Sequence, residues 1–286
     1  MEEIRMDAAR ASQRSGQLVI VRGGGDIATG TIYFLRRAGY PVLVLETEFP
    51  SAIRRYVAFS EAVYDGMSEI EGMKCRLAKN FEEACRIMED GDVAMMVDAE
   101  CEILRTVHPW ALVDGILAKK NLGTNRKMAP KTIALGPGFC AGEDVDLVIE
   151  TKRGHNLGRI IEWGSAAANT GIPGIIGGYG KERVIHSPAS GILKNRRRIG
   201  DIVAEGEEIA RIVCSDGSMV SVKASLTGLL RGLIRDGYPV TEGFKIADID
   251  PRKEEYKNCF TISDKARCIA GGVLAGLLYL EARRQA

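Results

Sequence analysis

The chain has 286 residues, of which 45% are hydrophobic and 27% charged, and its formal net charge is +1. These values are typical of a globular protein of about two domains, and they exclude a strong global field that recruits nucleic acid or a membrane surface. The seven cysteines are dispersed without a C-x-x-C pair, which argues against a disulfide framework and predicts no metal site. Residues 1–16 indicate a polar arm or short helix rather than a signal peptide, and the longest apolar run, 268–280, is too short to cross a bilayer, so we expect a cytoplasmic protein.

The first regular element is an apolar run over 18–21 that leads through Arg22 into three consecutive glycines. A helical pattern then continues to Gly39, and a second strand over 41–45 ends in Glu46. The stretch therefore predicts a strand, a tight turn, a helix and a second strand.

Gly23, Gly25 and Ala28 fit the G-x-G-x-x-[GA] fingerprint of dinucleotide-binding proteins. Gly23 permits the turn, Gly25 lets the backbone approach a pyrophosphate, and Ala28 lets the helix lie close to the strand. The helix N-terminus offers amide groups to phosphate oxygens, and Glu46, 23 positions after Gly23, is spaced to hold a ribose hydroxyl. We predict a Rossmann-like parallel sheet with α/β architecture.

A tight turn that only packs a helix on a sheet is the alternative for this loop. Asp26 would repel a phosphate from the first helical turn, and we interpret it as an N-terminal cap rather than a catalytic group. No catalytic residue is assigned. The candidate cofactor-binding residues are Gly23, Gly24, Gly25, Asp26, Ala28 and Glu46.

Further along the chain, Arg54 and Arg55 are candidates for binding a nucleotide phosphate or an anionic substrate, with a solvated basic surface as the alternative. We expect strands over 74–77, 93–97, 132–135 and 146–150 and a helix over 81–88. His108-Pro109-Trp110 predicts the start of another helix, which would continue to about residue 119.

Glycines and cations are concentrated over 150–183. Arg153, His155 and Lys181 are candidates for an anionic ligand, and the glycines predict a ligand-gated loop. A plain connector between two domains is the alternative.

Residues 191–212 and 228–249 form an internal repeat at an offset of 37, with ten of 22 positions identical. Two such halves predict a small all-β module that resembles the barrel-sandwich hybrid of biotinyl and lipoyl domains. The hairpin at 213–220 contains no lysine, so we expect neither biotin nor lipoate there and interpret the module as structural or docking.

The sequence predicts that the chain is divided into three parts. Residues 1–182 are expected to form the nucleotide-binding domain with its glycine-rich loop, and 183–250 the β module. Residues 251–286 are expected to carry a helix from Ser263-Asp264 to about 282 that packs back on the first domain.

Several stretches together resemble the YqeB-type accessory family of selenium-dependent molybdenum hydroxylases. The resemblance covers about residues 17–280 and rests on the segments 22–26, 52–55, 58–66, 135–139, 153–155, 169–174, 177–183, 230–237 and 248–252. It implies a protein that helps to mature or activate a molybdenum hydroxylase, with that enzyme and its cofactor-biosynthesis proteins as partners. It supplies no catalytic residue.

We therefore expect an accessory protein that binds NAD(P), another nucleotide or a molybdopterin-type cofactor. The alternatives are an NAD-dependent oxidoreductase that uses Gly23, Gly25, Ala28 and Glu46, and a scaffold whose glycine turn is empty. The sequence leaves open whether the protein is an enzyme and whether it is a homo-oligomer.

Overall fold

A computed structural model describes residues 14, 16–169, 171 and 174–285. The predicted N-terminal arm and residues 170, 172 and 173 of the glycine-rich stretch lie outside the described residues, apart from Arg14 and Gly16. The chain forms two compact units, 1–50 with 58–169 and 262–286, and 51–57 with 170–261.

The first unit is a mixed α/β structure built on one large sheet. Its strands are β1 (Val19–Arg22), β2 (Val42–Glu46), β3 (Met67–Ile70), β4 (Met73–Leu77), β5 (Val93–Val97), β6 (Ala111–Asp114), β7 (Thr132–Leu135), β9 (Leu147–Ile149) and β10 (Ile160–Ile161), with a separate pair β8 (Cys140–Ala141) and β11 (Gly164–Ser165). Its helices are α2 (Asp26–Arg37), α3 (Ala62–Asp65), α4 (Phe81–Glu89) and α5 (Asp264–Gln285), with short 3-10 turns η2 (Phe59–Glu61) and η3 (Glu102–Arg105).

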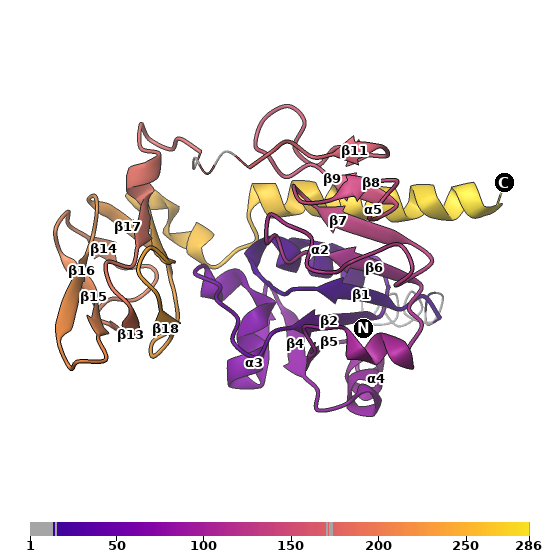
Figure 1. Cartoon of the computed structure of the whole chain (residues 1–286), viewed down its shortest axis with the longest axis horizontal. Helices are drawn as coiled ribbons and strands as arrows, with labels where there is room; N and C mark the ends of the chain where they lie inside the picture. Colours follow the sequence, from indigo (N-terminus) through magenta and orange to yellow (C-terminus); the bar gives the residue numbers. More distant parts are fainter. Residues whose placement is uncertain (1–13, 15, 170, 172–173, 286) are drawn as a thin grey trace. The chain divides into compact units, whose positions relative to one another are not determined.

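In the described residues the sheet runs β10-β9-β7-β6-β1-β2-β5-β4-β3, and Figure 1 labels the strands from β9 to β4. The pairing is parallel from β9 through β4 and antiparallel at the two edges, β10 and β3. The chain extends the sheet in one direction from β1 to β2 and in the other from β1 to β6. The strand order therefore reverses at β1, where open parallel sheets place their ligands beyond the carboxyl ends of the strands.

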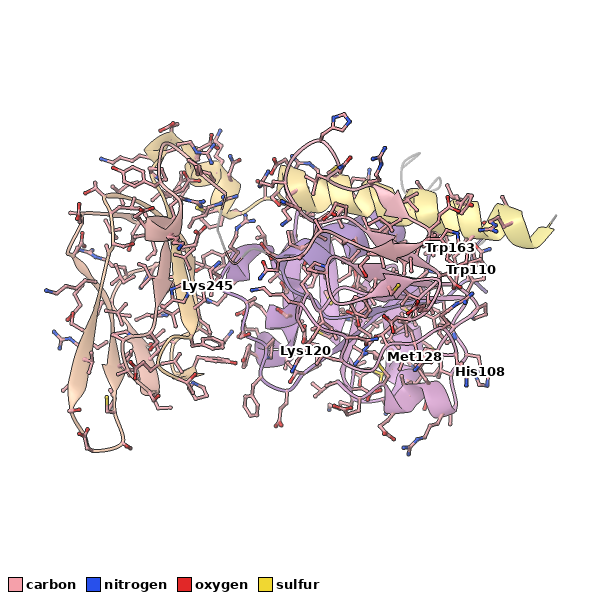
Figure 2. All side chains as sticks on the ribbon, turned by 45° about the horizontal axis from the view of Figure 1, so that its top comes forward. His108, Trp110, Lys120, Met128, Trp163 and Lys245 are labelled. Atoms are coloured by element: carbon pink, nitrogen blue, oxygen red, sulfur yellow. The ribbon has the colours of Figure 1, made fainter. Side chains whose placement is uncertain are left out.

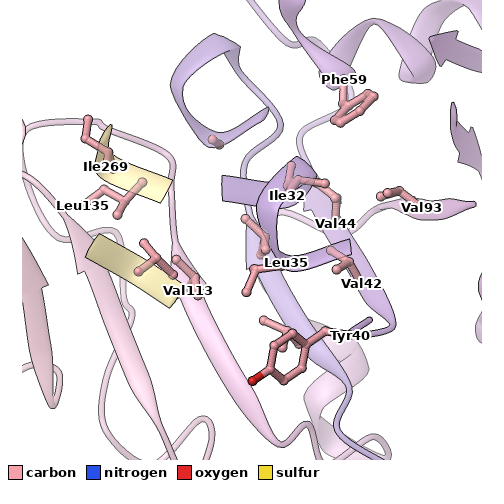
Figure 3. Packing of buried hydrophobic residues seen from close by; sticks show 14 of the residues in the cluster. Ile32, Leu35, Tyr40, Val42, Val44, Phe59, Val93, Val113, Leu135 and Ile269 are labelled. Atoms are coloured by element: carbon pink, nitrogen blue, oxygen red, sulfur yellow. The ribbon is translucent and has the colours of Figure 1, made fainter. Parts of the chain in front are cut away.

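Two apolar layers cover the sheet. Val44 and Val113 point to the face covered by α2 and α5, where Ile32 and Ile269 complete the core (Figure 3). Alternate residues of the same strands face the opposite side and pack against α4. This alternation buries the parallel strands on both faces, which explains their near-continuous apolar sequences.

The strands at 74–77, 93–97, 132–135 and 146–150 and the helix at 81–88 are confirmed to within a few residues. The predicted helix at 108–119 is wrong, because the segment contributes β6 to the centre of the sheet. The Trp110 amide donates to the Leu18 carbonyl at 2.8 Å, and β6 then pairs with β1 on one side and β7 on the other. Pairing with two distant strands overrides the local helical signal.

Helix α5 begins at the predicted position. Ser263 Oγ accepts a hydrogen bond from the Ala266 amide at 3.1 Å and caps the first turn. In Figure 1 the yellow α5 runs alongside α2, and the two helices pack closely at Gly30, where an added Cβ would lie 2.8 Å from the Ala266 backbone. No helix in the described part of the chain has the length and apolarity to cross a membrane.

The second unit consists of two four-stranded antiparallel sheets, β12-β19-β17-β14 and β16-β15-β13-β18, in the described residues. The elements are η1 (Arg55–Val57), η4 (Lys181–Arg183), β12 (Val184–His186), β13 (Gly191–Asn195), β14 (Ile202–Val203), β15 (Glu208–Val213), β16 (Met219–Lys223), β17 (Gly228–Leu233), β18 (Pro239–Val240), β19 (Lys245–Asp250) and η5 (Lys253–Cys259).

The sequence repeat is a structural repeat. Strands β13, β14 and β15 correspond to β17, β18 and β19 at the same offset of 37, and each short middle strand pairs into the sheet of the other copy. The hydrogen bonds repeat as well, since the Gly200 amide donates to Leu230 at 2.9 Å and the Gly237 amide donates to Leu193 at 2.8 Å. The two copies thus share one apolar core that neither copy encloses alone.

Candidate functional site

The glycine loop joins β1 to α2 at the point where the strand order reverses. Gly23 has φ +88°, and an added Cβ would lie 3.0 Å from Ile116 Cα, so both the backbone conformation and the space favour glycine. At Gly24 an added Cβ would lie 3.0 Å from the Ser60 amide nitrogen. At Gly25 it would meet nothing within 4 Å, so the space beside the helix N-terminus is open.

Gly25 is the N-cap residue of α2, and no side chain caps the first turn. Asp26 is the first helical residue, so its prediction as the N-terminal cap is wrong. Ala28 is buried and packs close to Gly115, where an added Cβ would lie 2.9 Å from the Ala28 Cβ. Ala28, the small third residue of the fingerprint, therefore allows α2 to lie close to the residue that follows β6.

Glu46 ends β2 and reaches back to the glycine loop. One carboxylate oxygen accepts a hydrogen bond from the Gly24 amide at 2.7 Å, and the other accepts from the Thr47 amide at 2.8 Å. Burial raises the pKa of this carboxyl above its ordinary value, while the two amide bonds act in the opposite direction.

Two apolar side chains lie exposed near Glu46. Val97 is paired with Glu46 in the sheet and is 46% exposed, and Phe49 follows β2 and is 57% exposed. The neighbouring Asp98 caps the next turn, since its carboxylate accepts bonds from the Glu102 and Ile103 amides at 2.8 and 2.9 Å.

A buried charged network lies behind the glycine loop. The Arg22 guanidinium donates to Thr124 Oγ1 at 2.5 Å and to the Ala99 carbonyl at 2.8 Å, and it lies 3.7 Å from Asp114. The Thr124 hydroxyl donates to Asp114 at 2.6 Å, and burial raises the pKa of the Asp114 carboxyl. No sequence motif indicates this network, and its one signal is a charged residue in each of two otherwise apolar strands.

The connection that follows β6 contacts the glycine loop at Gly23 and a second glycine-containing turn at Gly138. Leu117 and Lys119 adopt positive φ values of 59° and 65°, which non-glycine residues rarely do. Lys120, labelled in Figure 2, approaches Gly138 so closely that an added Cβ there would lie 2.7 Å from the Lys120 Cα. Residues 116–120 thus lie beside the carboxyl end of β1.

The other predicted anion-binding residues divide between the two units. Arg153 makes a two-pronged ion pair with Asp264 at 2.8 and 3.0 Å in the first unit, and His155 is exposed nearby in the sequence. Arg54, Arg55 and Lys181 belong to the second unit.

In the second unit, Arg54 donates to the Asn258 carbonyl at 3.0 Å and Arg55 to the Leu233 carbonyl at 2.8 Å, while Lys181 is exposed at the start of η4. The predicted loop at 150–183 is also divided, with residues up to 169 in the first unit and later residues in the second.

All seven cysteines are free. Within residues 14, 16–169, 171 and 174–285, no group of three or more His, Cys, Asp or Glu residues is arranged to hold a metal ion.

Comparison with known proteins supplies one informative match. No protein-family model matches the chain. Over 272 residues, 95% of this chain, the sequence is 50% identical to the Escherichia coli (strain K12) protein named Uncharacterized protein YqeB. The match supports the assignment of this chain to the YqeB-type family. The chain spans about half the length of this relative, 49%.

Two solved structures share a distant likeness. One is the apo form of the ectoine utilization protein EutE (DoeB) from Ruegeria pomeroyi, with 10% identity, coverage of 82% of this chain and 86% of that one, and a TM-score of 0.27. The other is an aspartoacylase family protein from Mesorhizobium loti, with 11% identity, coverage of 82% of this chain and 85% of that one, and a TM-score of 0.28. At these scores the likeness carries no argument about the site.

Proposed function

We propose that this chain binds a phosphate-bearing nucleotide or a molybdopterin-type cofactor and acts as an accessory protein in the maturation or activation of a selenium-dependent molybdenum hydroxylase. The observation that carries the binding proposal is the glycine loop at the strand-order reversal, with an open helix N-terminus at Gly25 and Glu46 bonded to Gly24. We assign a Rossmann-like fold to the first unit on this basis.

The chemistry of the loop suits a phosphate. The helix N-terminus presents amide groups and a partial positive charge, and the open space at Gly25 lets a phosphate approach the backbone. Each Glu46 oxygen accepts one amide bond and retains a lone pair for a ribose hydroxyl. Phe49 and Val97 offer apolar surface for a flat ring next to that acid.

The maturation role and the molybdenum-hydroxylase partner rest on the family resemblance. The 50% identity to YqeB supports the family, and the partner is what the resemblance to that family implies. This chain spans about half of the longer relative, and the same maturation role is proposed for that whole protein.

For the second unit we propose a barrel-sandwich hybrid that docks a partner. Its two interlocked copies and shared core support this fold. The hairpin between β15 and β16 carries Cys214, Asp216 and Gly217 but no lysine, so we do not expect a swinging arm to be attached at this hairpin.

Thermal unfolding in the presence of NAD⁺, NADH, NADP⁺, ADP and GDP tests the binding proposal, with nicotinamide fluorescence followed in parallel. The proposal predicts stabilisation by at least one phosphate-bearing ligand without consumption of NADH. Oxidation of NADH would favour the oxidoreductase. If neither these ligands nor a copurifying phosphate-bearing compound binds, the loop is an empty structural turn.

A further inference from the structure

Lys265 lies in the first turn of α5, directly after Asp264. A cation at this end of a helix opposes the helix dipole, which favours acidic residues there. Lys265 is also half-buried, so part of its hydration is lost. The fold therefore holds this amine in a position that is unfavourable on two counts.

Charged groups from three parts of the first unit act on Lys265. They are Arg153 and Glu150 from the segment after β9, Asp26 from α2, and Asp264 from α5 itself. Burial, followed by the charge of Arg153, lowers the pKa of the Lys265 amine.

The carboxylates on either side of Lys265 already have partners. Asp264 is held by the two-pronged ion pair with Arg153, and Glu150 accepts bonds from the Lys152 and Ala167 amides at 2.7 and 2.8 Å. Among the described residues, the Lys265 amine makes no hydrogen bond and no ion pair within 4.0 Å.

Lys265 lies at the same edge of the sheet as the glycine loop. Helix α2 begins at the carboxyl end of β1, and its Gly30 touches Ala266, the residue after Lys265. Further along α5, Gly272 lies against Ile149 at the carboxyl end of β9, and Gly276 lies against Leu147 at the start of that strand. The two helices thus run in the same direction away from this edge, and both begin there.

We propose that Lys265 is a ligand-binding residue whose ammonium group contacts a phosphate held at the glycine loop. This inference rests on the proposed function, because the phosphate belongs to the nucleotide or pterin-type ligand. It also resolves a conflict in the loop itself. Asp26 in the first turn of α2 would repel a phosphate, and a lysine beside it offsets that charge and supplies a donor to the phosphate oxygens.

The test compares ADP with adenosine, which lacks the phosphates, by calorimetric titration of the full chain and of three variants. A lost charged hydrogen bond predicts that Lys265→Met binds ADP at least about 10-fold more weakly, while its adenosine affinity is unchanged. Lys265→Arg keeps the charge and is expected to recover most of the ADP affinity. Arg267→Met removes a cation two residues along the same helix, on its exposed side, and is expected to stay within about 2-fold of the parent.

A second readout separates binding from a structural role. Since a deprotonated amine cannot attract phosphate, ADP affinity of the parent should fall as the pH rises through the lowered pKa of Lys265, and Lys265→Met should lack this fall. Equal ADP affinity in the parent and in Lys265→Met would overturn this inference and leave the proposed function intact. If the parent binds neither ADP nor inorganic pyrophosphate, both the glycine-loop proposal for these ligands and the role of Lys265 fail.

Discussion

The Glu46 carboxylate and the Gly24 amide are joined by a hydrogen bond of 2.7 Å. The bond connects the end of β2 to the turn that follows β1, so the acid is anchored to the glycine loop. Because its second oxygen is used by the Thr47 amide, the carboxylate is oriented before any ligand arrives. Preorganisation of this kind reduces the ordering cost that a ligand would otherwise have to offset.

Glu46 should make stability depend on pH. Its pKa is raised by burial, so the stability that this group contributes is fully present below the ordinary glutamate value of 4.5 and is lost as the pH rises through the raised value. Glu46→Gln stays neutral throughout. We expect the free energy of unfolding of the parent to decrease relative to Glu46→Gln as the pH rises from about 4.5 toward neutral pH, measured by urea denaturation.

Glutamine cannot accept both amide bonds, so the variant should also carry a pH-independent loss of about 1 kcal/mol. The test is therefore how the difference in free energy of unfolding between the two proteins changes with pH, and not the size of that difference at any one pH. A stability difference that stays constant over this range would show that the Glu46 carboxyl is not perturbed by burial.

Two of the loop glycines, Gly23 and Gly25, should respond differently to substitution. Gly23→Ala forces a Cβ against Ile116 at a positive φ and should lose about 1–3 kcal/mol of unfolding free energy. Gly25→Val adds its side chain to open space at φ −65° and should lose at most about 1 kcal/mol, mainly because valine is a poor N-cap. Chemical denaturation of both variants checks the order, and equal losses would contradict it.

Packing of α5 on α2 can be tested at glycine positions of the two helices. In Gly30→Ala the new methyl group would lie 2.8 Å from the Ala266 backbone, so we expect a destabilisation of about 1–3 kcal/mol. In Gly271→Ala the methyl group meets nothing within 4 Å, and the better helix propensity should stabilise the protein by about 0.5–1 kcal/mol. Similar shifts of the two melting temperatures would mean that the helices do not pack as closely as described.

The second unit should not be a cofactor carrier. The hairpin between β15 and β16 has no lysine, so coexpression with a biotin or lipoate ligase and the matching cofactor should leave the intact mass unchanged. A mass increase of either cofactor on a lysine of 183–250 would contradict the docking role that we propose for this module.

Local patterns predicted the parts of the fold that depend on neighbouring residues. The run from Val19 through the glycines to Glu46 encodes its own strand, turn and helix, and the repeat at an offset of 37 marks matching strands in each copy. The segment around Trp110 was assigned wrongly because its strand is defined by hydrogen bonds to β1 and β7, which lie far away in the sequence.

The candidate site was predicted less completely for the same reason. The bond between Glu46 and Gly24 follows from the spacing of one β-α-β unit. The network of Arg22, Asp114 and Thr124 joins residues about a hundred positions apart, and Lys265 arrives from the last helix. No local pattern encodes contacts of that range.

Mass spectrometry of small molecules released from native protein tests the central claim most directly, with the parent and Gly25→Val purified side by side. The open space at Gly25 is where we place the phosphate, and we expect a branched side chain to fill it at a loss of at most about 1 kcal/mol of stability. We predict a phosphate-bearing nucleotide or pterin compound from the parent and none from Gly25→Val. Equal amounts of such a compound from both proteins, with the variant folded, would contradict the assignment of the glycine loop as the binding site.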